Sequence, residues 1–177
     1  MEEEALEFAA KAHGEQQRKY SEELYIEHPK RVAGIVRTVQ HNSAMICAAY
    51  LHDVVEDTPV RLQEIQEIFG KEVAALVDEL TDEFVKEKYP QLNRKKRKER
   101  EVARQATMSR RAKTVKLADV IDNVPGIVKN DRNFARRYIP EMEALTKALQ
   151  GGDEALYTRA IELVNWGKHQ LKMRQKA

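Results

Sequence analysis

The stretch "AAYLHDVVEDTP" (residues 48–59) joins an apolar run to a group of charged side chains. The run itself begins earlier, as "AMICAAYL" (residues 44–51). A helix that is apolar on nearly all sides is expected to lie in the centre of a core. Four polar residues follow directly, namely His52, Asp53, Glu56 and Asp57. The sequence therefore predicts one central helix, from about residue 44 to residue 56, whose C-terminal end carries a histidine and three carboxylates.

On a helix, Glu56 lies one turn from His52 and Asp53, and Asp57 lies one turn from Asp53. Three carboxylates at a C-terminal helix end repel one another and the negative end of the helix dipole. A divalent cation would neutralise this charge, and imidazole with carboxylate oxygens suits Mn²⁺, Fe²⁺ or Zn²⁺. The alternative is a solvated helix end, with His52 as a partly buried side chain that binds no metal.

The rest of the chain predicts an all-α fold. Only 7 glycines and 5 prolines interrupt 177 residues, and strand-type alternation is absent from the sequence. The length suits one domain, which we place at residues 1–177, with about eight to nine helices. The last helices are expected over about residues 131–172. Within the pattern of residues 114–128, Pro125 is expected to kink or break the helix.

Composition argues against several classes of protein. A formal net charge of +2 does not indicate a nucleic-acid or membrane binder. The single cysteine, Cys47, excludes a disulfide framework and suits a reducing, cytoplasmic setting, where it is expected to be a small core residue. No apolar run approaches the roughly 18 residues of a membrane span.

Residues 86–113 form an exposed basic segment in this interpretation, part loop and part helix. It contains "NRKKRKER" (residues 93–100), in which apolar residues are too sparse for a buried helix. Three interpretations stay open: a solvated face, a basic rim that attracts a polyanionic substrate, and a nucleic-acid or nuclear-targeting segment. Aromatic residues are not interleaved with the basic ones, so we do not expect nucleic acid as a partner.

His28, the pair His52-Asp53 and Asp119 together resemble the H…HD…D pattern of the HD-domain metal-dependent phosphohydrolases. Longer stretches, "AHGEQQRKYSEELYIEHPKRVA", "LHDVVEDT" and "KLADVIDN", are similar to the hydrolase domain of the RelA/SpoT-type (p)ppGpp enzymes and to the stand-alone small alarmone hydrolases. The resemblance covers about residues 8 to 125. Ordinary HD proteins lack the additional Glu-Asp pair of "LHDVVEDT", which makes this motif specific.

The resemblance implies a helical HD-domain bundle and a Mn²⁺-dependent hydrolase, although another divalent metal is possible. Such an enzyme removes the 3′-pyrophosphate from (p)ppGpp and leaves GDP or GTP. It also implies roles for individual residues: His28, His52, Asp53 and Asp119 as metal ligands, Glu56 and Asp57 as catalytic carboxylates, Arg18 and Lys19 on the guanine base, Asn123 on the nucleotide, Lys116 facing phosphate, and His13 in support of the pocket.

The sequence departs from the family at positions expected to face the substrate. Glu15 precedes Gln16 where the family usually has glycine, and "VPG" (residues 124–126) follows "KLADVIDN" where members often carry arginine. A guanine-nucleotide alarmone is therefore the expected substrate, with NADPH or another nucleotide as the alternative. A non-catalytic nucleotide-sensing HD module is a third hypothesis. The apolar face of the last helix, with Leu163 and Trp166, is expected to be core or a homo-oligomer contact.

Overall fold

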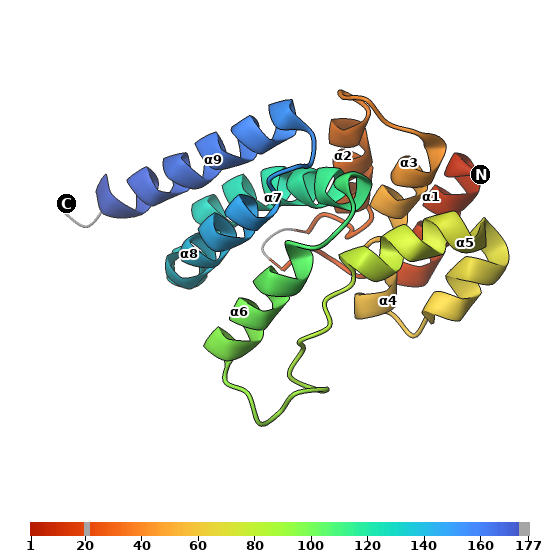
Figure 1. Ribbon diagram of the computed structural model, residues 1–177, viewed down its shortest axis with the longest axis horizontal. Helices are drawn as coiled ribbons and strands as arrows, with labels where there is room; N and C mark the ends of the chain where they lie inside the picture. The colour runs from red at the N-terminus through yellow and green to blue at the C-terminus, as the bar shows by residue number, and fades with distance from the viewer. Residues whose placement is uncertain (20–21, 174–177) are drawn as a thin grey trace. The chain divides into compact units, whose positions relative to one another are not determined.

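The computed structural model describes residues 1–19 and 22–173, and these contain nine helices (Figure 1). Extended pairing within the described residues is limited to one antiparallel bridge between Gln17 and Leu24. The all-α prediction is therefore confirmed. No described helix combines the length and the apolar character that crossing a membrane requires. The chain divides into two compact units, residues 1–82 and residues 83–177, and the single domain over residues 1–177 stays a prediction.

The first unit is built around the apolar segment that opened the sequence analysis. That segment forms α3, which contacts α1, α2 and α5. The side chain of Asn42 caps α3 by accepting a hydrogen bond from the Met45 N–H at 3.0 Å. The Cys47 side chain is fully buried, as predicted, and burial raises the pKa of its thiol. The helices of this unit are α1 (Glu2–His13), α2 (Glu27–Val36), α3 (Ser43–Leu51), α4 (Val54–Asp57) and α5 (Leu62–Leu80).

The prediction of one continuous helix over residues 44–56 is wrong. Helix α3 ends at Leu51, His52 and Asp53 form a turn, and the single-turn helix α4 follows. The His52 ring lies 2.9 Å from the Ala49 carbonyl oxygen through Nδ1. In a continuous helix that carbonyl would accept from the Asp53 N–H, so the side chain competes with the helical bond. The break redirects Asp53 relative to an ideal helix.

The second unit consists of α6 (Arg94–Gln105), α7 (Arg110–Asn130), α8 (Arg132–Ala148) and α9 (Glu154–Met173). Helix α7 packs on α8 and α9, and α6 packs on α8. Helix α7 continues through Pro125, so the helix does not break there, and the kink expected as the other outcome stays a prediction. The neighbouring Val124 is fully buried and Ile121 nearly so, and their packing offsets the helical hydrogen bond that proline removes.

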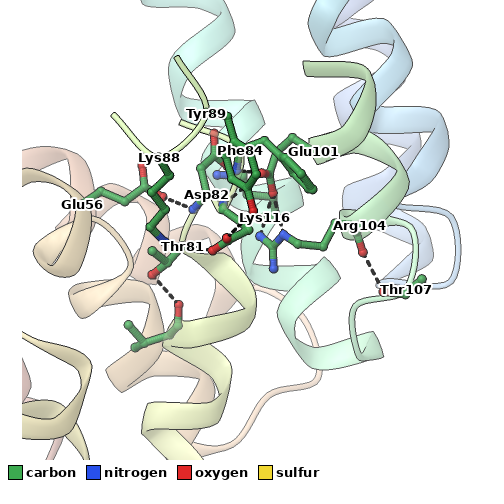
Figure 2. Close-up of polar contacts among 12 residues, drawn as sticks. Glu56, Thr81, Asp82, Phe84, Lys88, Tyr89, Glu101, Arg104, Thr107 and Lys116 are labelled. Carbon is green, nitrogen blue, oxygen red and sulfur yellow. Dashed lines mark hydrogen bonds and ion pairs between the residues drawn. The ribbon is translucent and has the colours of Figure 1, made fainter. Parts of the chain in front are cut away.

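A buried carboxylate fixes the start of the second unit. Glu101 on α6 is 2% exposed and accepts from the backbone N–H groups of Glu83 and Phe84 at 2.9 and 2.8 Å. Its other oxygen pairs with Arg104 at 2.7 Å, one helical turn away. Figure 2 shows this carboxylate between the Arg104 guanidinium and the loop that carries Phe84. Charge-assisted hydrogen bonds of this kind are stronger than neutral ones, so Glu101 holds the loop against α6.

We predict that Glu101→Ala destabilises the protein by about 3 kcal/mol, because it leaves two backbone donors and the Arg104 charge without their acceptor. The matched control is Glu99→Ala on the same helix, whose exposed carboxylate meets Lys95 only at 3.9 Å and whose loss is expected to change stability by less than about 0.5 kcal/mol. Urea unfolding followed by circular dichroism measures both. Equal unfolding free energies for the two variants would contradict the assigned role of Glu101.

Candidate metal centre and active site

Three of the four predicted metal ligands meet within the first unit. His28 comes from the first turn of α2, and His52 and Asp53 come from the turn between α3 and α4. The two imidazoles are each 1% exposed, and their ring nitrogens lie within 4.8 Å of each other. Both Nε2 atoms face the same oxygen, Oδ2 of Asp53, at 3.6 Å from His28 and 3.0 Å from His52. The three residues lie close together, and their predicted role as metal ligands stays a prediction.

The protonation of His52 follows from its second ring nitrogen. Nδ1 lies 2.9 Å from the Ala49 carbonyl oxygen, and because a carbonyl can only accept, Nδ1 carries the proton. In the neutral ring, Nε2 then presents its lone pair to the Asp53 carboxylate. Two acceptor atoms 3.0 Å apart attract each other only through a proton or a cation. A histidine that donates one ring N–H to a carbonyl and offers the other nitrogen to a metal is a recurrent arrangement.

The donor set therefore fits a divalent cation. Neutral imidazole and carboxylate oxygen are ligands that Mn²⁺, Fe²⁺ and Zn²⁺ all accept. The buried positions of His28 and His52 limit competition from water at these nitrogens. His28, His52 and Asp53 are therefore candidate ligands for a divalent metal in the first unit.

Tyr25 is a residue at this site that the sequence analysis missed. Its hydroxyl donates to Asp53 Oδ2 at 2.6 Å, and its ring meets the edge of His28 with centroids 5.9 Å apart. A signal was present in "LYIEHP" (residues 24–29), where Tyr25 precedes the candidate ligand His28 by three residues. His13, which was expected to support the pocket, is buried and packs on the Tyr25 ring at 4.7 Å.

The two predicted catalytic carboxylates lie on α4, directly after the ligand turn, and both reach solvent. Glu56 accepts from the Asp82 backbone N–H at 2.5 Å, as Figure 2 shows, so a segment distant in sequence fixes its side chain. Asp57 is the last residue of α4, and the hydroxyl of the next residue, Thr58, donates to the Val54 carbonyl oxygen at 2.7 Å. Both carboxylates therefore project from a short helix whose C-terminal end is capped by hydrogen bonds to Val54.

The surroundings of Asp57 raise the pKa of its carboxyl group above the ordinary value. Loss of solvation is the largest cause, and the nearby Asp53 carboxylate adds to it by repulsion. The Tyr25 hydroxyl, His13 and His52 act in the opposite direction and favour the ionised form. A carboxylate with a raised pKa is a stronger base than an ordinary aspartate.

The predicted site residues on α7, which are Lys116, Asp119 and Asn123, lie together in the second unit. Asp119 is buried, and its two oxygens have different partners: Asn123 Nδ2 donates to Oδ1 at 2.6 Å, and Lys116 Nζ lies 3.1 Å from Oδ2. The predicted common face of Lys116, Asp119 and Asn123 is therefore confirmed. These contacts hold the Asp119 carboxylate in one orientation on α7.

Arg18 and Lys19 lie in a short hairpin between α1 and α2. The Arg18 N–H donates to the Glu23 carbonyl oxygen at 2.9 Å, and the Gln17–Leu24 bridge closes the hairpin. Tyr20 and Ser21, which follow Lys19 in the sequence, lie outside the described residues. The predicted contact of Arg18 and Lys19 with a guanine base stays a prediction.

The predicted basic segment is part loop and part helix, as expected, and its helical parts are α6 and the first turn of α7. Arg94 is paired with Glu141 through two hydrogen bonds of 2.8 and 2.7 Å and lies over the Phe134 ring. Other basic side chains of α6, among them Lys95 and Lys96, are exposed. Between α6 and α8 there is a groove of about 700 Å³ with Val102 and Pro140 in its lining. The three interpretations of the segment remain open.

Comparisons with known proteins show the family to which the chain belongs. A model of the HD domain matches residues 5–144, which include every predicted site residue. Guanosine-3′,5′-bis(diphosphate) 3′-pyrophosphohydrolase MESH1 of Drosophila melanogaster is 36% identical over 130 residues, covering 72% of this chain and 69% of that protein. The chain belongs to the HD-domain family, as the sequence motifs predicted.

This chain also matches a further curated relative and a solved structure, and it covers very different shares of the two. A probable guanosine-3′,5′-bis(diphosphate) 3′-pyrophosphohydrolase of Synechocystis is 49% identical over 74 residues, which is 42% of this chain and only 10% of that protein. A solved structure, described as a metazoan ortholog of SpoT that hydrolyses ppGpp, superposes with a TM-score of 0.82 at 30% identity. That match covers 93% of this chain and 94% of the other.

We predict that His52→Ala lowers the affinity for Mn²⁺ at least about tenfold, because it removes one ligand whose second nitrogen is already oriented. His41→Ala is the matched control, since His41 is exposed and its Nδ1 contacts the Val39 carbonyl oxygen. Isothermal titration calorimetry on metal-free protein measures both affinities, and a melting curve checks that each variant is folded. An unchanged Mn²⁺ affinity in folded His52→Ala would exclude His52 as a ligand.

Proposed function

We propose that this protein is a Mn²⁺-dependent hydrolase that removes the 3′-pyrophosphate of (p)ppGpp, leaving GDP or GTP. The observation that carries the proposal is the convergence of His28, His52 and Asp53, followed one turn later by Glu56 and Asp57. The relatives named for this activity, and the solved structure of a ppGpp-hydrolysing protein, support the choice of substrate.

We further propose that Asp119 completes the metal site. Its position in "KLADVIDN" matches the family's final aspartate, and its buried carboxylate has the chemistry of a ligand. Lys116 and Asn123, which now contact Asp119, are proposed to face the phosphates and the nucleotide. Arg18 and Lys19, on the hairpin, are proposed to hold the guanine base.

The proposed reaction begins with water at the phosphorus that is attached to the 3′ oxygen of the ribose. A bound divalent cation polarises phosphoryl oxygens and makes a nearby water more acidic. Glu56 or Asp57 orients the attacking water and accepts its proton, and such acid–base help contributes roughly 10²–10⁴-fold. The bond between that phosphorus and the 3′ oxygen breaks, the oxygen takes up a proton, and pyrophosphate leaves.

The two carboxylates suit different parts of this task. Glu56 is fixed by the Asp82 N–H, which favours a role in orienting water. Asp57 has a raised pKa, which favours a role in accepting the proton of the attacking water. A basic rim formed by α6 is proposed to attract the polyanionic substrate. The cytoplasmic setting and a homo-oligomeric state stay predictions.

The test is an assay of purified protein with Mn²⁺ on ppGpp, pppGpp and NADPH side by side, with products separated by ion-exchange chromatography. We expect pyrophosphate with GDP from ppGpp and GTP from pppGpp, and no product once EDTA removes the metal. Glu56→Gln combined with Asp57→Asn should lower kcat at least about a hundredfold. Glu64→Gln, on α5 and outside the site, is the matched control.

Three outcomes would contradict the proposal in whole or in part. If ppGpp stayed intact while NADPH was cleaved, the substrate would be NADPH, the alternative given above, and not ppGpp. Intact substrates throughout, with nucleotide bound but not cleaved, would favour the non-catalytic sensing module. Undiminished hydrolysis in the double variant would remove Glu56 and Asp57 from the catalytic assignment.

A further inference from the structure

Tyr25 is held firmly at both its backbone and its ring. Its N–H donates to the Gln16 carbonyl oxygen at 2.7 Å, which ties it to the opposite arm of the hairpin. One side of the ring packs on the buried His13 at 4.7 Å with an interplanar angle of 35°, and another meets His28 nearly edge-on at 73°. His13 is itself fixed, because its Nδ1 lies 3.0 Å from Gln16 Oε1. These contacts leave the Tyr25 hydroxyl little freedom of direction.

The hydroxyl points at the carboxylate that the two imidazoles share. It lies 2.6 Å from Asp53 Oδ2, a length typical of a strong hydrogen bond to an ionised acceptor. The same hydroxyl lowers the pKa of Asp57 by hydrogen bonding, against the larger effects of desolvation and Asp53. One phenol therefore acts on a proposed metal ligand and on a proposed catalytic carboxylate.

We infer that Tyr25 is a positioning residue that fixes the orientation of the Asp53 carboxylate for a divalent cation. The inference rests on the metal site of the proposed function. Tyr25 also connects the metal site to the proposed base-binding residues, because Arg18 and Lys19 lie on the same hairpin, which backbone hydrogen bonds close. Carboxylate ligands are regularly oriented by a hydrogen bond from outside the coordination sphere, and loss of that partner weakens metal affinity about 10–100-fold.

The test is the variant Tyr25→Phe, which keeps the ring and its packing and removes only the hydroxyl. Mn²⁺ affinity is measured by calorimetry on the metal-free protein, with a melting curve to check the fold. We expect the affinity to fall about tenfold or more. Tyr157→Phe is the matched control, because Tyr157 lies on α9 and has no part in the proposed site. Its Mn²⁺ affinity should equal that of the parent.

A folded Tyr25→Phe that binds Mn²⁺ as tightly as the parent overturns the inference, and so does a parent that binds no Mn²⁺. Neither result depends on the substrate. A parent that binds Mn²⁺ but leaves ppGpp intact overturns the proposed function, while the metal affinities of the two tyrosine variants still decide the role of Tyr25.

A second measurement uses the unaltered sequence and so covers the case in which Tyr25→Phe does not fold. The protein is labelled with ¹³C at Cζ of Tyr25, and the resonance is followed by NMR during titration with diamagnetic Zn²⁺. Because this carbon responds to hydrogen bonding of the phenol, its resonance should shift in proportion to metal occupancy. A resonance that stays unchanged at full occupancy contradicts the inference.

Discussion

The structure of the first unit depends on one oxygen atom, Oδ2 of Asp53. It accepts from the Tyr25 hydroxyl at 2.6 Å and faces the Nε2 atoms of His52 and His28 at 3.0 and 3.6 Å. These groups come from the hairpin, from α2 and from the end of α3. Three segments of the chain therefore meet at one carboxylate. When it is ionised, this carboxylate is stable beside the Nε2 lone pair of His52 only if a proton or a cation compensates it.

That requirement explains features that are otherwise unfavourable. A continuous helix would gain regular hydrogen bonds through residues 52–56, yet the chain breaks there and uses the Ala49 carbonyl to orient His52. Two further carboxylates, Glu56 and Asp57, follow within one turn, and repulsion from Asp53 raises the pKa of Asp57. Local arrangements that reduce stability are typical of functional sites. A divalent cation bound here would offset the negative charge of the three carboxylates.

Much of this arrangement could be predicted from the sequence. The all-round apolar segment of residues 44–51 predicted a buried helix, and α3 is almost entirely buried. The joint position of His28, His52 and Asp53 was predicted from the HD pattern, and the common face of Lys116, Asp119 and Asn123 from helical spacing. These predictions succeed because they depend on local periodicity or on motifs whose geometry is fixed by short stretches.

The sequence predictions that failed have a common physical cause. Each depended on an interaction between groups that helical periodicity does not bring together. The break after Leu51 follows from a side chain that competes for a backbone carbonyl, and propensity alone does not predict it. Helix α7 passes Pro125 because burial of its neighbours outweighs one lost hydrogen bond. Tyr25 was missed because a tyrosine in a sequence is usually interpreted as a core residue. The hydrogen bonds from backbone N–H groups to Glu101 were missed because every residue type except proline carries this donor, so the sequence does not indicate which one is used.

The central claim is that Nε2 of His28 and Nε2 of His52 bind the same divalent cation. Its most direct test is anomalous diffraction from crystals grown with Mn²⁺, recorded on both sides of the manganese absorption edge. The predicted result is one strong peak about 2 Å from both nitrogens, with oxygen of Asp53 in its coordination sphere. A map with no manganese peak between these two imidazoles, from crystals in which the protein is saturated with Mn²⁺, would contradict it.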